Sequence, residues 1–260
     1  LLKEASHLRH KGEKGISRQR LTEDPRSLIQ ERDQKWIQPR NTIAVALARI
    51  FFVCNRFILH LFFQVSGAGT EHIPDCTPYI ITPNHSSYLD AFALAAVLNK
   101  RQIEHIYWAG AREVAFRNVL FRLFCRMARI VPVRHGRGSL SSLAFALAVL
   151  KESNGLVLFP EGRRSQDGTL QEFEQGLEIV FNAADVPVVP VIITGSHAAW
   201  PPGRLFPRPH PITVHFSAPV TVKELKDNAA RSEDTKEGLD ILHRHMLEKQ
   251  KVVDGVRSRA

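Results

Sequence analysis

A histidine and an aspartate five positions apart are the residues of this chain best suited to acid–base chemistry. His85 and Asp90 lie in the run NHSSYLD, residues 84–90. A neutral imidazole held in one tautomer by a carboxylate can take a proton from a hydroxyl group near neutral pH. The spacing is too wide for ordinary neighbours on one helical face, so the pair meets only if a loop carries His85 back over the first helical turn. The alternative is that His85 caps a helix and Asp90 only favours the helix dipole.

The flanking residues predict the position of this run in the fold. Residues 79–82 are apolar and β-prone and are followed by Pro83, whereas the alanine- and leucine-rich residues 90–98 favour a helix. His85 is therefore expected on a strand-to-helix loop. Open α/β folds usually bind their ligands at such loops, in the crevice at the carboxyl end of a parallel sheet.

A second run carries two cations behind a turn. Residues 155–159 predict a buried strand, and the Pro-Glu-Gly that follows predicts a turn. Arg163 and Arg164 then lie at another carboxyl-end loop, where guanidinium groups can bind a phosphate in two-pronged fashion. Glu161 can orient one of these arginines or hydrogen-bond the substrate. The alternative is a surface loop whose charges pair with one another and add little stability.

Both runs resemble motifs of the 1-acyl-glycerol-3-phosphate acyltransferase (lysophospholipid acyltransferase) family. The first looks like its NHxxxxD block, and the run FPEGRRS, residues 159–165, looks like its FPEGTRS block. The run Val186–Val191 is similar to a late proline-containing strand of the family, and Phe173 with Gly176 resembles its FxxG helix start. The resemblance extends over roughly residues 66–222.

Two places depart from the family pattern. Arg163 stands where the family motif has a threonine, which adds a cation and removes a hydroxyl. In the run IVPVRH, Arg134 and His135 stand where the family often has aspartate and arginine. Phosphate binding is therefore expected to be shifted by one residue or rebuilt there.

The resemblance implies an O-acyltransferase. In that reading His85 deprotonates the hydroxyl of a lysophospholipid or glycerol phosphate, Asp90 orients His85, and the oxygen attacks an acyl thioester without an acyl-enzyme. The donor is acyl-CoA or acyl carrier protein, and no cofactor is implied. By the same analogy, the expected substrate-binding residues are Asn84, Glu161, Gly162, Arg163, Arg164, Ser165 and Arg134. A rival reading is a catalytically silent membrane-binding module with the same fold.

The charge balance favours an anionic partner. The chain has 35 Lys and Arg residues against 26 Asp and Glu, a net charge of +9. Much of the excess lies in residues 100–137, and a helix expected over residues 113–128 can turn its arginines toward anionic lipid headgroups. A solvated helix face is the alternative. Binding to nucleic acid is not expected, because the arginines lack interleaved aromatic residues and no recognition module is present.

Residues 43–65 form the most apolar stretch of the chain. They approach the length that spans a bilayer, but Arg49, Arg56 and His60 interrupt them. Each arginine at mid-membrane would cost about 2.5 to 3.5 kcal/mol. An in-plane amphipathic helix, peripheral or monotopic on the cytoplasmic face of the cell membrane, is therefore favoured over a spanning one. A helix buried against the domain is the competing interpretation.

The alternation of strands and helices predicts an α/β fold with a mostly parallel sheet covered by helices on both faces. The expected parts are a polar arm or linker (1–40), an amphipathic membrane-associating helix (41–65), an acyltransferase domain (66–222) and a charged helical tail (223–260). Further strands are expected at residues 105–108, 130–133, 187–194 and 211–216, and further helices at 139–153 and 172–184.

The remaining residues that can carry chemistry point to no further site. Three scattered cysteines form neither a disulfide framework nor a zinc site, which favours a reducing compartment, and the twelve histidines show no convincing metal-ligand cluster. No metal is expected. The first residue is Leu1, and residues 107–110 and 201–204 resemble acyltransferase domains fused behind acyl-activating synthetases, which suggests a piece of a longer protein.

Overall fold

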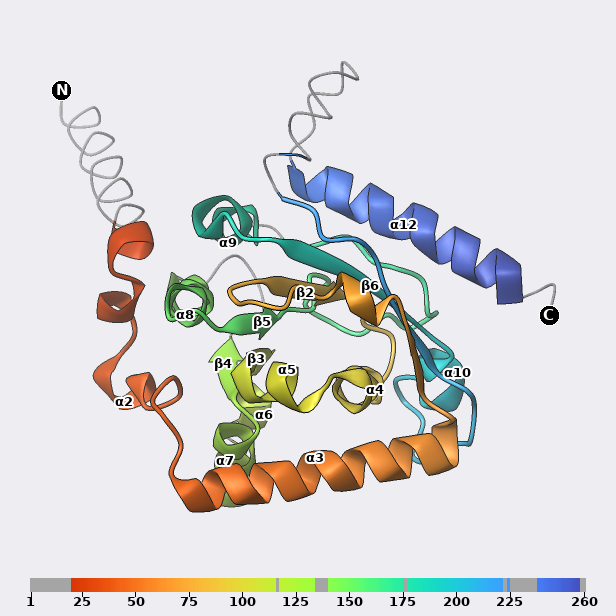
Figure 1. Cartoon of the computed structure of the whole chain (residues 1–260), viewed down its shortest axis with the longest axis horizontal. Coiled ribbons are helices and arrows are strands. Elements are labelled where there is room, and N and C mark those ends of the chain that lie inside the picture. The colour runs from red at the N-terminus through yellow and green to blue at the C-terminus, as the bar shows by residue number, and fades with distance from the viewer. Residues whose placement is uncertain are drawn as a thin grey trace.

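The core of the molecule is one mixed sheet (Figure 1). The computed structural model describes residues 20–115, 117–133, 140–174, 177–221, 224 and 238–257. Within these residues the strand order is β1-β7-β6-β2-β5-β3-β4. Neighbouring strands are parallel except for β6 and β7, so five adjacent strands run one way and β1 and β7 run the other. The strands are β1 (Ser66–Ala68), β2 (Ile80–Pro83), β3 (Ile106–Ala111), β4 (Ile130–Val133), β5 (Gly155–Val157), β6 (Val188–Thr194) and β7 (Thr213–Phe216).

Alternating side chains of the central strands fill two separate cores. Ile80 of β2 belongs to the core on one face of the sheet, and its neighbour Ile81 belongs to the core on the other. Both are completely buried, as is expected for a parallel strand covered on both sides. β2 pairs with β5 and β6, so the loop that follows it begins at the middle of the sheet.

Helices cover both faces, which confirms the predicted fold class. In Figure 1, α8 (Leu140–Lys151), α9 (Leu177–Ala184) and α12 (Gly238–Arg257) lie on one side of the sheet, and α3 (Thr42–Phe63) and α4 (Asp90–Val97) lie on the other. The other helical segments are η1 (Pro25–Leu28), α2 (Glu31–Gln34), η2 (Thr70–His72), α5 (Lys100–His105), α6 (Arg112–Ala115), α7 (Val119–Met127) and α10 (Ser196–Ala199).

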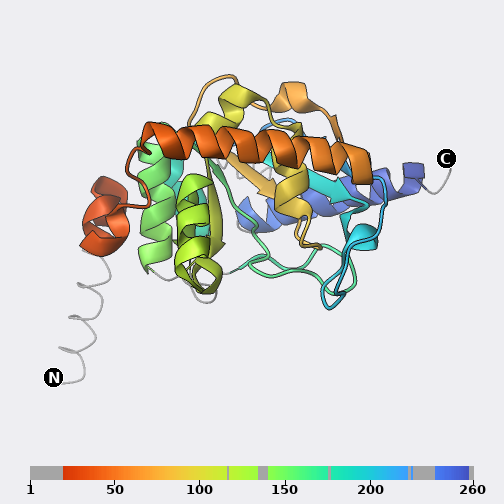
Figure 2. The same cartoon turned by 90° about the horizontal axis from the view of Figure 1, so that it is seen from below.

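The long helix α3 lies across the outside of the domain on top of α4 (Figures 1 and 2). Two of its polar residues reach α4. Asn55 Nδ2 donates to the carbonyl of Phe92 over 3.0 Å, and Arg56 donates to the carbonyls of Ala96 (2.8 Å) and Leu98 (2.6 Å) at the end of α4. Arg56, one of the two arginines that interrupt the apolar pattern, therefore satisfies helix-end carbonyls, and many of the apolar residues of α3 stay exposed.

The helix expected over residues 113–128 is interrupted. It consists of α6 and α7, and α7 begins anew at Asn118, whose side chain accepts a hydrogen bond from Phe121 N at 2.8 Å. An asparagine at the N-cap competes with continued helix because its side chain satisfies a free backbone N–H. Helix α7 lies beside α3, where the rings of Phe51 and Phe124 meet edge to face at 5.0 Å.

Both ends of the described chain pack more closely than expected. The arm predicted to be polar and loosely packed has a described part that places Leu21, Ile29 and Trp36 in the same core as α8. The charged tail likewise buries Leu242 and Met246 of α12 in that core. The apolar residues of these polar segments were too few to reveal a periodic pattern, yet several of them are buried in the core.

Candidate active site

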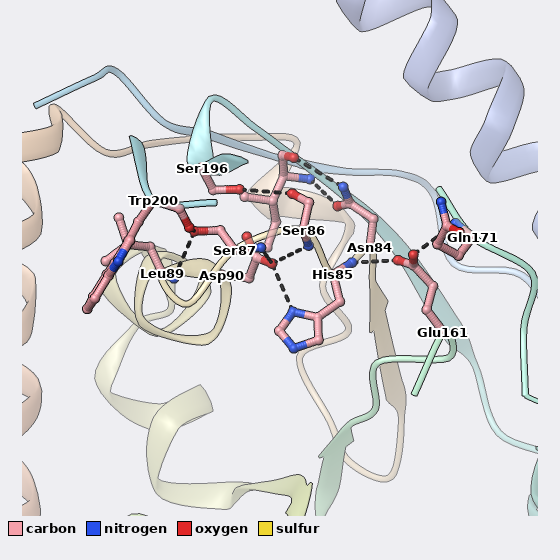
Figure 3. Close-up of polar contacts among 11 residues, drawn as sticks. Asn84, His85, Ser86, Ser87, Leu89, Asp90, Glu161, Gln171, Ser196 and Trp200 are labelled. Atoms are coloured by element: carbon pink, nitrogen blue, oxygen red, sulfur yellow. Dashed lines mark hydrogen bonds and ion pairs between the residues drawn. The ribbon is translucent and has the colours of Figure 1, made fainter. Parts of the chain in front are cut away.

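The loop between β2 and α4 brings His85 and Asp90 together (Figure 3). His85 Nδ1 lies 2.9 Å from Asp90 Oδ2. The same oxygen accepts the backbone N–H groups of Ser86 and Ser87, both at 2.7 Å. The loop thus folds back over the first turn of α4, which is the geometry that the five-residue spacing requires. Asp90 is completely buried, and its Oδ2 is the oxygen on which all three contacts converge.

The hydrogen bond fixes which nitrogen of His85 can act as a base. A carboxylate oxygen that already accepts two N–H groups accepts a third from Nδ1, so the neutral ring carries its proton on Nδ1 and leaves Nε2 free. The His85 side chain is 19% exposed, and its ring lies 4.3 Å from that of Phe159. The imidazole is therefore supported on two sides and open on a third.

Asn84 fixes the start of this loop. Its Oδ1 accepts from Ile193 N at 2.7 Å and its Nδ2 donates to Ile193 O at 3.3 Å (Figure 3). The side chain thereby extends the pairing of β2 with β6 beyond the last residue of β2. Asn84 is 2% exposed. Its polar groups bind the protein itself, where we predicted a contact with substrate.

Glu161 joins the two motifs through the backbone. Its Oε1 accepts from His85 N at 2.5 Å, and its Oε2 accepts from Gln171 N at 2.8 Å. Burial raises the pKa of this carboxyl to about 7, against the opposing effect of the two N–H groups. Within the described chain neither oxygen bonds Arg163 or Arg164, so Glu161 does not orient an arginine there. It instead connects the backbone of His85 to the backbone of Gln171.

The turn after β5 depends on a glycine. Gly162 has φ +66°, and a Cβ there would lie 2.2 Å from the side chain of Glu174. Ser165 N donates to His85 O at 2.8 Å, which ties the turn to the histidine loop. The Ser165 hydroxyl donates to Asp167 at 2.8 Å and accepts from Gly168 N at 3.0 Å. It therefore stabilises the turn over residues 165–168.

The two arginines of the turn have different surroundings. Arg163 is exposed. The Arg164 guanidinium lies 4.1 Å above the ring of Tyr88, which in turn lies 5.2 Å from the ring of Trp200. Neither arginine forms an ion pair in the part of the chain that the structure describes. Arg134 and Gly176 lie outside the described residues.

A cavity of about 590 Å³ opens beside the imidazole. His85, Arg163 and Arg164 line it together with apolar residues. Its walls come from the ends of β3, β4 and β5 and from α7, α8 and α9, and they include Phe121, Phe124, Leu143, Ala146, Leu158, Phe159, Leu177 and Val180. The arrangement therefore combines an imidazole, two cations and a mainly apolar cavity.

Sequence reasoning missed three residues of this region. Tyr88 occupies a variable position inside the first motif, and Trp200 follows α10, so only the fold places them beside Arg164. Gln171 acts through its backbone N–H, which every residue except proline has, so its side chain carried no signal. In the described parts of the chain no three His, Cys, Asp or Glu residues form a group that could hold a metal ion.

Comparison with known proteins identifies the family of this chain. A family model described as Acyltransferase matches residues 64–194. A 1-acyl-sn-glycerol-3-phosphate acyltransferase of Limnanthes douglasii is 32% identical over 158 residues, covering 60% of this chain and 54% of that protein. The alpha form from Mus musculus is 25% identical over 197 residues, covering 73% and 65%. The chain thus spans about half to two thirds of the length of these curated relatives.

The fold has a solved counterpart. The crystal structure of PlsC from Thermotoga maritima, a 1-acyl-sn-glycerophosphate acyltransferase, matches with a TM-score of 0.61. The match covers 86% of this chain and 85% of that one at 22% identity. At this identity the likeness establishes the arrangement of the elements.

Proposed function

This chain belongs to the acyltransferase family, and from this premise we propose that it moves a fatty acyl group from a thioester donor to the free hydroxyl of a lysophospholipid or glycerol phosphate. The donor is acyl-CoA or acyl carrier protein. The names of the relatives, 1-acyl-sn-glycerol-3-phosphate acyltransferase, support this acceptor class. The observation that carries the proposal is the His85–Asp90 pair, formed at 2.9 Å at the side of an apolar cavity.

The chemical step uses the free nitrogen of the imidazole. His85 Nε2 takes the proton of the acceptor hydroxyl while the oxygen attacks the thioester carbonyl. A C–O bond forms, the tetrahedral intermediate collapses with cleavage of the C–S bond, and the imidazolium returns its proton to the thiolate. Asp90 holds the ring and stabilises its transient positive charge. Atoms and protons balance as one ester and one thiol, so no acyl-enzyme is required.

We propose a separate place for the acyl chain of the donor and for the phosphate of the acceptor. The acyl chain fits the cavity, because its lining is mainly apolar between α7, α8 and α9. The phosphate of the acceptor fits Arg163 and Arg164 at the same cavity, since guanidinium groups bind phosphate through paired hydrogen bonds. Asn84, Glu161 and Ser165 shape the site through bonds within the protein, and Gly162 permits the turn.

We further propose that α3 and α7 lie on an anionic membrane surface. Helix α3 is long and apolar enough to cross a bilayer by length and composition alone, which by itself is weak evidence. Its inner side is committed to α4 through Asn55 and Arg56, which favours an in-plane position. The scattered cysteines, which favour a reducing compartment, support the cytoplasmic face. The exposed apolar residues of this surface are Ile43, Leu47, Ile50, Val53, Phe57, Ile58, Leu61, Phe62, Val119, Leu120, Phe121 and Leu123.

Cosedimentation with vesicles tests the membrane surface. Phe57 is 67% exposed on α3, and Val252 is 61% exposed on α12, on the opposite side of the sheet (Figure 1). We expect Phe57→Asp to lower the fraction bound to anionic vesicles at least about tenfold, because it removes an apolar contact and adds a repelled charge. Val252→Asp is the matched control and should bind as wild type does. Equal loss in both variants would contradict this placement of the membrane.

Thiol release tests the activity. The protein is mixed with an acyl-CoA and lysophosphatidate, and the free thiol and the diacyl product are both measured. We expect turnover in the wild type and a loss of about 10²- to 10⁴-fold in kcat for His85→Ala, the range of a general base. His105→Ala, an exposed histidine before β3, should retain activity. Undiminished turnover in His85→Ala would refute the base, and vesicle binding without any thiol release would identify a catalytically silent module.

A further inference from the structure

The C-terminal helix α12 contacts the loop that follows the arginine turn. His243 Nε2 lies 3.1 Å from the carbonyl oxygen of Gln171, and the His243 ring meets Phe173 edge to face, with centroids 4.8 Å apart. One further contact lies beyond, where Gln250 Nε2 donates to Gly168 O at 3.4 Å. These contacts join segments about seventy residues or more apart in the chain.

Helix α12 is itself firmly seated. Leu242 is 1% exposed and Met246 is completely buried, and both belong to the core that contains α8 and α9. His243 directly follows Leu242, so its side chain belongs to a helix that cannot shift without exposing core residues. The loop, by contrast, has no regular secondary structure between residues 165 and 174. The rigid partner of this contact is therefore the helix.

The contacted residue is also the one that holds Glu161. Gln171 uses its carbonyl for His243 and its N–H for Glu161 Oε2 at 2.8 Å. Glu161 Oε1 then accepts from the backbone N–H of His85 at 2.5 Å. Figure 3 shows Glu161 between His85 and Gln171, with α12 passing beside Gln171. Three consecutive hydrogen bonds thus connect α12 to the residue proposed as the base.

We propose that α12 is a positioning element of the acyltransferase site and that His243 is a positioning residue, which holds the backbone of Gln171 so that Glu161 can fix the histidine loop. This inference rests on the proposed function for its effect on catalysis. It concerns a helix that lies outside the matched family region, residues 64–194, and outside both motifs. His243 touches no substrate in this proposal and acts only through the loop.

The contact requires a donor at residue 243. A carbonyl oxygen only accepts, so His243 Nε2 carries a proton in this contact. Two substitutions separate the hydrogen bond from packing. His243→Gln keeps a donor at a similar reach and removes the ring, whereas His243→Phe keeps a ring against Phe173 and removes the donor. His245, exposed on the same helix, provides the matched control as His245→Ala.

Hydrogen exchange of the backbone amides measures the positioning directly. In the full-length protein, we expect His243→Phe to speed exchange of the Gln171 amide about fivefold, because the segment opens more often when one hydrogen bond is lost. His243→Gln and His245→Ala should exchange as wild type does. Unchanged exchange in His243→Phe, or an equal increase in His243→Gln, would overturn the role of the hydrogen bond.

Kinetics of acyl transfer supply the second readout. We expect His243→Phe to lower kcat about fivefold with less than a twofold change in KM for the thioester. The reason is that the imidazole of His85 is displaced while the residues that line the cavity stay in place. His243→Gln should restore kcat. A loss that appears in KM alone, or that His243→Gln fails to rescue, would contradict positioning. If the wild type transfers no acyl group, the proposed function fails, and the exchange experiment still decides whether His243 holds the loop.

Discussion

The histidine loop, residues 84–90, and the arginine turn, residues 160–165, follow the carboxyl ends of neighbouring parallel strands. Their charged side chains are held in place in different ways. In the histidine loop a buried carboxylate gathers three donors, and Asn84 is paired with Ile193. In the turn, the charged groups of Arg163 and Arg164 find no carboxylate among the described residues. The proposed base is therefore held in place by the protein itself, whereas the two guanidinium groups keep their charge available for an anion.

The different surroundings reflect different chemical tasks. A general base must be positioned to within tenths of an ångström of the proton that it takes, so neighbours that fix the imidazole ring favour catalysis. A phosphate-binding group gains from an uncompensated charge, because an internal carboxylate would have to be displaced first. The ring of Tyr88 under Arg164 restrains the guanidinium without neutralising it. The following substitutions test each side of this comparison.

Removing the charge of Asp90 should have the largest effect. Asp90→Asn places an amide where three donors converge, so at least one hydrogen bond is lost or the imidazole changes tautomer. We expect kcat to fall about 10²- to 10⁴-fold with a small change in KM. Asp185→Asn, at an exposed position after α9, is the matched control. Normal turnover in Asp90→Asn would show that the fixed half of the site is not needed for catalysis.

Glu161 lies at the junction of the two regions and should make folding stability depend on pH. Burial raises its pKa to about 7, so between its ordinary pKa and that value the folded chain retains a proton that the unfolded chain has lost. The free energy of unfolding should therefore fall as pH rises, by about 3 kcal/mol between pH 4.5 and 8. Glu161→Gln removes this slope.

Urea unfolding at pH 5 and pH 8 measures the effect. We expect the wild type to lose stability relative to Glu161→Gln on going from pH 5 to pH 8. Glu172→Gln, an exposed neighbour on the loop, should keep the dependence of the wild type. If the free energy of unfolding changed equally with pH in wild type and Glu161→Gln, the Glu161 carboxyl would be ionised from pH 5 to pH 8. The two loops would then be joined by a carboxylate at every pH tested.

The arginines should give the smallest effect, confined to the acceptor. We expect Arg164→Ala to raise KM for lysophosphatidate about tenfold to a hundredfold, because it loses a charged hydrogen bond to the phosphate. Arg163→Ala should raise KM less, because the Arg163 side chain is exposed. Arg101→Ala, exposed on α5, is the control. With a monoacylglycerol, which has no phosphate, the variants should match the wild type. A loss of equal size with that acceptor would show that the turn is structural.

The sequence predicted the central strands and helices because each has a continuous apolar pattern. Residues 130–133 and 187–194 form β4 and β6 much as expected. The edge strand β1 was missed, since its three residues, Ser66–Ala68, are small and exposed and form no apolar pattern. The described part of the N-terminal arm was wrongly expected to pack loosely, because isolated side chains such as Trp36 reach the core without a periodic pattern around them.

The meeting of His85 and Asp90 was predicted from their side chains, whereas the role of Glu161 was missed because it depends on the backbone. Spacing was sufficient to bring His85 and Asp90 together in expectation, and they do meet. The role of Glu161 was not apparent, because its partners are the N–H groups of His85 and Gln171. Backbone groups are the same at every position, so only the folded chain shows which of them a buried carboxylate reaches.

The attachment of α3 to α4 has a mechanical consequence. Arg56 grips the last carbonyls of α4, and Asp90 is the first residue of the same helix, so an element of eight residues, about 12 Å long, links the two. One end of α4 is thus bound to α3 and the other end to His85. If α3 lies on a lipid surface as we propose, the length of α4 contributes to the distance between that surface and the proposed base.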